Sequence, residues 1–247
     1  MVWAFLLLLG IIAAIHAYDY RRSVQEYTFA QPETISDVKG VLSEKTPVVL
    51  NIGALPWRPE IAEKSSWMIE TGSGSEADQQ TPVAEWKEGI TIGNRAALAL
   101  TIGLNTGLGE LDEARALWWL PGFFDSRVDI LPSDKVVPLH WVDAERHWIG
   151  CSSGAPITLW LVHSRYRRFL PTTDEPVDPW NLTVTTAPWI GRVQYIPVRI
   201  HPDWCIGIPT HWGVAIRSEV TDDKKPSWIW TSNQHSPLSW LVSPELT

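Results

Sequence analysis

The sequence predicts a mainly β domain, either a barrel or a sandwich with a few flanking helices, preceded by one N-terminal transmembrane helix. Two patterns favour this fold class. The first is an apolar run at the N-terminus. The second is a series of short apolar segments that turn residues separate at intervals of about ten residues. These patterns divide the chain into an anchor over residues 1–20, a juxtamembrane segment with a short helix over 21–44, and a β domain over 45–247.

The anchor is predicted from residues 2–17, which read VWAFLLLLGIIAAIHA and contain no charged side chain. With the residues that follow, the run is close to the ~20 residues that cross a bilayer. A signal peptide cleaved after Ala17 and a soluble core helix are the alternatives, but the basic region that normally starts a signal peptide is missing. We therefore expect an uncleaved anchor.

The residues at the ends of this run favour a membrane position. Trp3 lies at one end, and Tyr18 and Tyr20 lie at the other, where aromatic side chains prefer the membrane interface. Arg21 and Arg22 follow directly. Because positive charge flanks the span only on its C-terminal side, the C-terminal domain is expected on the cytoplasmic side of the membrane.

The remaining elements follow from local patterns. Before the β series we expect a short helix over 33–42, a strand over 47–52, a polar loop within 65–82, a strand at 89–92 and a helix over 108–119. From residue 135 onward the expected strands read VVPLHWV, APITLWLV, TVTTAPWI, VQYIPVRI, WCIGIP, GVAIRSEV and SWIWTSN.

Composition excludes some classes of function. The net charge of −8 and the pI of about 5.3 argue against a nucleic-acid partner, because phosphates require a basic surface. The only two cysteines, Cys151 and Cys205, are interpreted as buried thiols, with one disulfide as the alternative in an oxidising compartment. The 16 tryptophans are interpreted mainly as core residues, and any others would form a surface that binds a protein partner.

Six short segments, taken in order, resemble the cupin-like domains of the Jumonji-C class. They are KTPVVL at 45–50 with Trp57 shortly after it, LWWLPGFF at 117–124, WIG at 148–150, RFLP at 168–171, HPDWCIGIPTHWGVAI at 201–216 and SN at 232–233. The motif residues in them are Pro47, Trp148, Gly150, Pro171, Asp203, Ile208, Pro209, Trp212 and Asn233. The resemblance implies a double-stranded β-barrel, and the spacing Ile208-Pro209-x-x-Trp212 is its most specific part.

The same resemblance implies a metal site in catalytic members, which bind Fe(II) through a His-x-Asp/Glu pair and a distant His and use 2-oxoglutarate. The distant His is expected at the position of Val214, and the pair near Leu161 and His163. Hydrocarbon side chains cannot ligate iron, so we expect no cofactor and no catalytic residue. If the protein is an enzyme, the candidate ligands are His201, Asp203 and His211, with Fe(II) and 2-oxoglutarate as cofactors.

The function predicted from these observations is that of a membrane-anchored, non-catalytic scaffold whose Trp-rich surface binds another protein. Such proteins resemble membrane-associated proteins of large DNA viruses, which implies a structural role in a virion or a membrane complex. An Fe(II)/2-oxoglutarate-dependent oxygenase is the first alternative. A small-ligand-binding barrel with an apolar, tryptophan-lined pocket is the second.

Overall fold

The computed structural model describes residues 2–24, 29–32, 41, 45–51, 68–71, 80–82, 90–92, 96, 99–100, 104, 108, 123–171, 176–219 and 227–235. In these residues the protein is mainly β, with two large antiparallel sheets and few helices. The mainly β prediction is therefore confirmed. The helices expected at 33–42 and 108–119 lie almost wholly outside the described residues.

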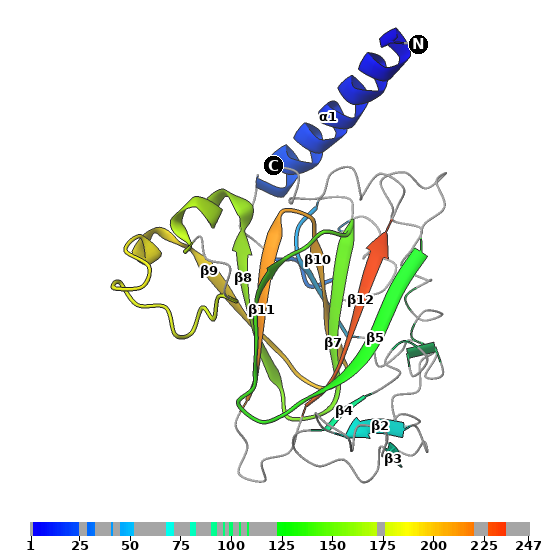
Figure 1. Ribbon diagram of the computed structural model, residues 1–247, viewed down its shortest axis with the longest axis vertical. Helices are drawn as coiled ribbons and strands as arrows, with labels where there is room; N and C mark the ends of the chain where they lie inside the picture. The colour runs from blue at the N-terminus through cyan, green and yellow to red at the C-terminus, as the bar shows by residue number, and fades with distance from the viewer. Residues whose placement is uncertain are drawn as a thin grey trace.

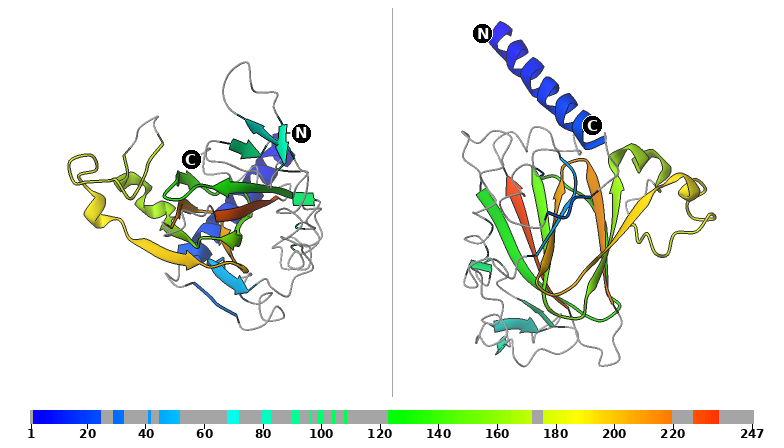
Figure 2. Two further views of the ribbon diagram at one scale, coloured as in Figure 1. Left: turned by 90° about the horizontal axis from the view of Figure 1, so that it is seen from below. Right: turned by 180° about the vertical axis from the view of Figure 1, so that it is seen from behind.

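The N-terminal helix α1 (Val2–Val24) extends past the predicted end of the anchor at residue 20. It projects from one end of the β domain, and most of its length lies clear of that domain (Figures 1 and 2). Among the helices that can be described, none combines the length and mean hydropathy of a membrane-crossing segment. The helix itself is confirmed, whereas the transmembrane span is not supported.

The five-stranded sheet has the order β1-β10-β7-β12-β5, and the four-stranded sheet has the order β6-β11-β8-β9 (Figure 1). The first consists of β1 (Val48–Asn51), β10 (Trp204–Pro209), β7 (Arg146–Gly154), β12 (Ser227–His235) and β5 (Phe123–Leu131). The second consists of β6 (Val136–Trp141), β11 (Trp212–Ser218), β8 (Ile157–His163) and β9 (Tyr195–Ile200).

A third, three-stranded sheet lies at the end of the domain opposite α1 (Figure 1). It consists of β3 (Gln80–Pro82), β2 (Met68–Thr71) and β4 (Ile90–Ile92). The strand expected at 89–92 is thus confirmed. The polar loop expected within 65–82 is corrected at its two ends, where β2 and β3 pair, while residues 72–79 lie outside the described residues.

The main core lies between the two large sheets. Alternate residues of each strand point inward, and they are mostly branched aliphatic residues, as a sheet with one buried face requires. Ile149 of β7 and Ile206 of β10 are Cα partners in the five-stranded sheet, while Leu161 of β8 and Val214 of β11 are partners in the other. All four side chains are fully buried.

The five-stranded sheet is buried on its other face as well, and two tryptophans dominate that face. Trp148 and Trp230 are 0% and 1% exposed. A Cβ atom added at Gly150 would lie 2.2 Å from Trp230, and one added at Gly207 would lie 2.7 Å from Trp148. The glycine of the Trp-Ile-Gly motif is therefore required because an indole ring packs directly on its backbone.

One predicted strand is wrong. Residues 183–190 form hydrogen-bonded turns that lead into the 3₁₀ helix η4 (Ile190–Arg192). The Thr183 N–H donates to Thr186 Oγ1 at 3.0 Å, and the Ala187 N–H donates to the Thr183 carbonyl at 2.7 Å. Threonine favours strands by composition, but here its hydroxyl groups compete for backbone partners and stabilise the turns.

The two cysteines are free and buried, as the sequence predicts. Cys151 lies in the core between the sheets. In the register of β7 and β10, the Cα partner of Cys151 is Trp204, and the Cα partner of Cys205 is Gly150. Because successive residues in a strand face opposite sides, the two thiols lie on opposite faces of the sheet and cannot form a disulfide there.

Candidate functional site

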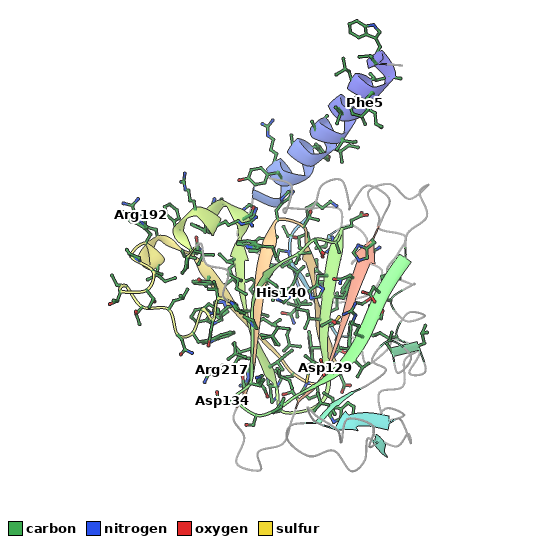
Figure 3. All side chains as sticks on the ribbon, viewed as in Figure 1. Phe5, Asp129, Asp134, His140, Arg192 and Arg217 are labelled. Carbon is green, nitrogen blue, oxygen red and sulfur yellow. The ribbon has the colours of Figure 1, made fainter. Side chains whose placement is uncertain are left out.

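A buried and a half-buried histidine from opposite sheets, His147 and His140, face each other in the β domain. His140 of β6 and His147 of β7 have ring centroids 5.6 Å apart, with their planes at 87°. His140 is labelled within the domain in Figure 3. Neither residue is among the candidate ligands that the sequence predicts.

Hydrogen bonds fix the orientation of both rings. Nδ1 of His140 lies 3.1 Å from the carbonyl oxygen of Pro138, and Nδ1 of His147 lies 2.5 Å from Oδ1 of Asn233. Both oxygens are acceptors, so both Nδ1 atoms carry the hydrogen and both Nε2 atoms carry a lone pair. Within the described residues, the buried Nε2 of His147 has no hydrogen-bond partner.

Burial keeps the two rings uncharged. It lowers the pKa of His147 from 6.5 to about 4, and the nearby rings of His140 and His235 lower this pKa further, whereas the hydrogen bond to Asn233 raises it. Burial also lowers the pKa of His140. The site therefore presents two neutral imidazoles near pH 7, which is the form that binds transition metals.

Among the described residues, the side chains around the pair add no third metal ligand of the usual kinds. Val214, at the position where the family resemblance places the distant His, is fully buried and is the Cα partner of His140. Val142 is also buried in the same core. In the described part of the chain, no group of three His, Cys, Asp or Glu side chains could hold a metal ion. Catalytic Fe(II) sites of the class that the sequence resembles use three protein ligands, and the described residues bring no such set together.

The structure does not bring together the alternative ligands. His201 and Asp203 lie in the exposed turn before β10, where the Asp203 N–H donates to the Cys151 carbonyl at 3.0 Å. Asp203 has a positive φ of 66°, which identifies it as a turn residue. His211 lies in the turn after β10. A six-residue strand spans roughly 20 Å, so these side chains belong to opposite ends of the domain.

Leu161 and His163, near which the His-x-Asp/Glu pair is expected, serve the core and a helix cap instead. Leu161 is buried in the core, and His163 ends β8 and caps the 3₁₀ helix η3 (Ser164–Phe169). The Arg165 N–H donates to Nδ1 of His163 at 3.1 Å. Burial lowers the pKa of His163 to about 4. His163 therefore stabilises the start of η3.

A second cluster joins α1 to the β domain. The ring of Tyr20 lies 5.6 Å from the ring of His163 and 5.2 Å from that of His211, measured between centroids. His163 in turn packs edge-on against Trp212 at 5.3 Å. Tyr20, which the sequence assigns to the membrane interface, contacts the β domain in the structure. This cluster holds the C-terminal end of α1 at the top of β8 and β11.

These features define a mainly β protein of two antiparallel sheets, whose interior contains a histidine pair. No family model matches the chain, and none of the curated proteins matches it. Among solved structures, the coconut allergen cocosin is similar over 46% of this chain and 22% of that chain, at 11% sequence identity and a TM-score of 0.29. A similarity this low does not define a family or a function for the chain.

Proposed function

We propose that this protein is a membrane-attached, non-catalytic scaffold, in which α1 enters a bilayer and the β domain, on the cytoplasmic side, binds another protein of a membrane complex. The observation that carries the proposal is the exposure of α1. Its large apolar side chains between Val2 and Ile11 are 46% to 83% exposed. Each would contribute about 1.5–3 kcal/mol if fully removed from water, so this surface strongly favours a lipid environment.

The proposal includes a cupin-like barrel as the scaffold. Successive strands from β5 to β12 mostly alternate between the two sheets, which is typical of double-stranded barrels. Branched aliphatic side chains fill the space between the sheets. An interior of this kind supports a structural role better than a small-ligand pocket.

The proposed surface for the protein partner includes Trp189. Trp148, Trp212 and Trp230 are buried, so they stabilise the core and do not form a docking surface. Trp189 is 54% exposed and lies in the segment that connects η3 to β9. It is the tryptophan of the described β domain that best fits an interaction role.

Flotation of the full chain with phosphatidylcholine vesicles tests membrane attachment. The protein should float with the vesicles and resist carbonate extraction, whereas Leu7→Asp/Leu8→Asp should stay in the soluble fraction. A matched control is Leu100→Asp, because Leu100 is 64% exposed outside α1. Release of the unmodified chain by carbonate without detergent would contradict the proposal.

A second measurement tests the non-catalytic part. The purified chain should contain no stoichiometric iron and should release no succinate from 2-oxoglutarate. An oxygenase that uses an unusual ligand set would contain stoichiometric iron and would release succinate. In that case the scaffold role must be abandoned. Loss of iron in His140→Ala or His147→Ala would then identify that histidine as a ligand, whereas unchanged iron content would identify it as a structural residue.

A further inference from the structure

Four arginines gather on one side of an otherwise acidic protein. Arg165, Arg167 and Arg168 belong to η3, and Arg192 belongs to η4; together they are called the arginine patch.

The described stretches 163–171 and 179–195, which contain the patch, have no Asp or Glu. Asp174 and Glu175 lie outside the described residues. Asp178 accepts hydrogen bonds from Trp180 and Asn181. The patch therefore carries concentrated positive charge, although the chain has a net charge of −8.

Two of these guanidinium groups converge on one aromatic ring. Cζ of Arg168 lies 4.8 Å from the centre of the Phe169 ring, and Cζ of Arg192 lies 5.9 Å from the same centre. Arg192 also lies 4.7 Å from the Trp189 ring. Stacking on aromatic faces fixes both groups while their N–H edges stay available.

Other exposed arginines of the β domain behave differently. Arg127, Arg199 and Arg217 each form an ion pair with a carboxylate, from Asp125, Glu219 and Asp134 respectively. Within the described residues, Arg168 and Arg192 have no such carboxylate. Two like charges held close together without a counter-charge favour an anion that both can bind.

The arginine patch lies beside the base of α1. The Ser164 N–H at the start of η3 donates to the His211 carbonyl at 2.7 Å, and His211 contacts Tyr20 of α1. Figures 1 and 2 show η3 next to the C-terminal end of the helix, and Figure 3 shows Arg192 on the same side. A bilayer that α1 enters would therefore lie next to these arginines.

Exposed apolar side chains accompany the charges. Trp189 is 54% exposed and Val184 is 69% exposed, and both lie between η3 and β9. Tryptophan beside arginine is typical of surfaces at the headgroup level of a membrane, because indole favours the interface and guanidinium binds phosphate.

We propose that the arginine patch is a second membrane contact, in which Arg168 and Arg192 bind the phosphate groups of anionic lipids in the leaflet that α1 enters. This inference rests on the proposed membrane attachment and deepens it, because it names the lipid chemistry. The acidic chain would then prefer an anionic bilayer through a local patch and not through its net charge.

The test uses the full chain and two kinds of vesicle, phosphatidylcholine alone and phosphatidylcholine with phosphatidylserine. Because each arginine near an anionic surface contributes about fivefold in affinity, the unmodified chain should bind the anionic vesicles at least about tenfold more tightly. High salt should abolish this difference. Arg168→Gln/Arg192→Gln should bring binding to anionic vesicles close to the level seen with neutral ones, without changing neutral binding.

A matched control is Arg127→Gln/Arg217→Gln, which removes the same charge from exposed arginines outside the patch. It should keep the preference for anionic vesicles. Equal binding of the unmodified chain to both vesicles, or an equal loss in patch and control variants, would overturn the inference. Failure of attachment by α1 gives a different result, because the unmodified chain would then not bind neutral vesicles at all.

Discussion

The ring of Tyr20 stands edge-on to the ring of His211, with centroids 5.2 Å apart and planes at 90°. The same tyrosine also contacts His163. One side chain of α1 therefore packs on the end of β8 and on the turn after β10. These contacts fix the direction of the apolar helix α1 relative to the two sheets.

Replacing Tyr20 with Ala should loosen this junction. Spin labels at Ala13→Cys and Thr185→Cys report the distance from α1 to the β domain, and both native thiols are buried and out of reach. The unmodified chain should give a narrow distance distribution, and Tyr20→Ala should broaden it, because aromatic contacts worth about 0.5–1.5 kcal/mol are lost. Tyr18→Ala, at a more exposed position of the same helix, should leave the distribution narrow. An equally narrow distribution in Tyr20→Ala would show that other contacts fix α1.

Gly150→Ala should destabilise the protein by about 1–3 kcal/mol in urea unfolding, because the new methyl group meets the Trp230 ring. The site leaves no room, since the added Cβ would lie 2.2 Å from that ring. Gly191→Ala is the matched control, because nothing lies within 4 Å of its added Cβ. In a Trp230→Leu background the cost of Gly150→Ala should fall, and a cost that stays constant would mean that the clash is not with the indole.

Acid should weaken the fold through His147 and His163. The pKa of each is lowered in the folded protein to about 4, from 6.5. The unfolded chain then binds more protons, so this contribution to the free energy of unfolding is complete above pH 6.5 and is lost as the pH falls toward about 4.

Each of the two histidines can remove up to about 1.4 kcal/mol of stability per pH unit in that window. Urea midpoints across the window should fall steeply for the unmodified chain and less steeply for His147→Gln. Substitution of the exposed Thr185, which has no ionisable side chain, by Gln should leave the slope unchanged. The interpretation fails if His147→Gln shows the original slope.

Val214→His should create a metal site where the native chain has two imidazoles. The new side chain would lie beside His140, its Cα partner, and a third nitrogen ligand completes the minimum set for Zn²⁺. Competition with a chromophoric chelator should show at least about tenfold tighter Zn²⁺ binding than in the native chain. Val214→Thr, which is similar in shape but carries no imidazole, should show no gain. If Val214→His/His140→Ala binds as tightly as Val214→His, the metal is bound elsewhere.

Local patterns in the sequence predicted much of the fold. The strands at Tyr195–Ile200, Trp204–Pro209 and Ser227–His235 lie where apolar and β-branched runs favour them. Residues 183–190 are similar in composition but form turns. There the hydroxyl groups of Thr183 and Thr186 satisfy backbone groups locally, and a composition pattern does not register that competition.

The candidate site was much less predictable. His147 and its partner Asn233 lie 86 residues apart and meet only because β7 and β12 are neighbours in one register. The sequence identifies Asn233 as a motif residue of the Jumonji-C resemblance, but it does not identify His147 as the residue to which Asn233 is hydrogen-bonded. The absence of a donor at Val214 was visible in the sequence, but its position beside His140 required the pairing of β6 with β11.

The sequence by itself determined that an apolar segment at the N-terminus forms a helix and that short apolar runs form strands. Both depend on side chains close together in the chain, where hydrophobicity and backbone preference act directly. Only the tertiary structure decided which face of α1 meets the β domain, which histidines face each other, and that Arg168 and Arg192 share one aromatic ring. These relationships join residues brought together by strand register and turns, and no local pattern specifies that register.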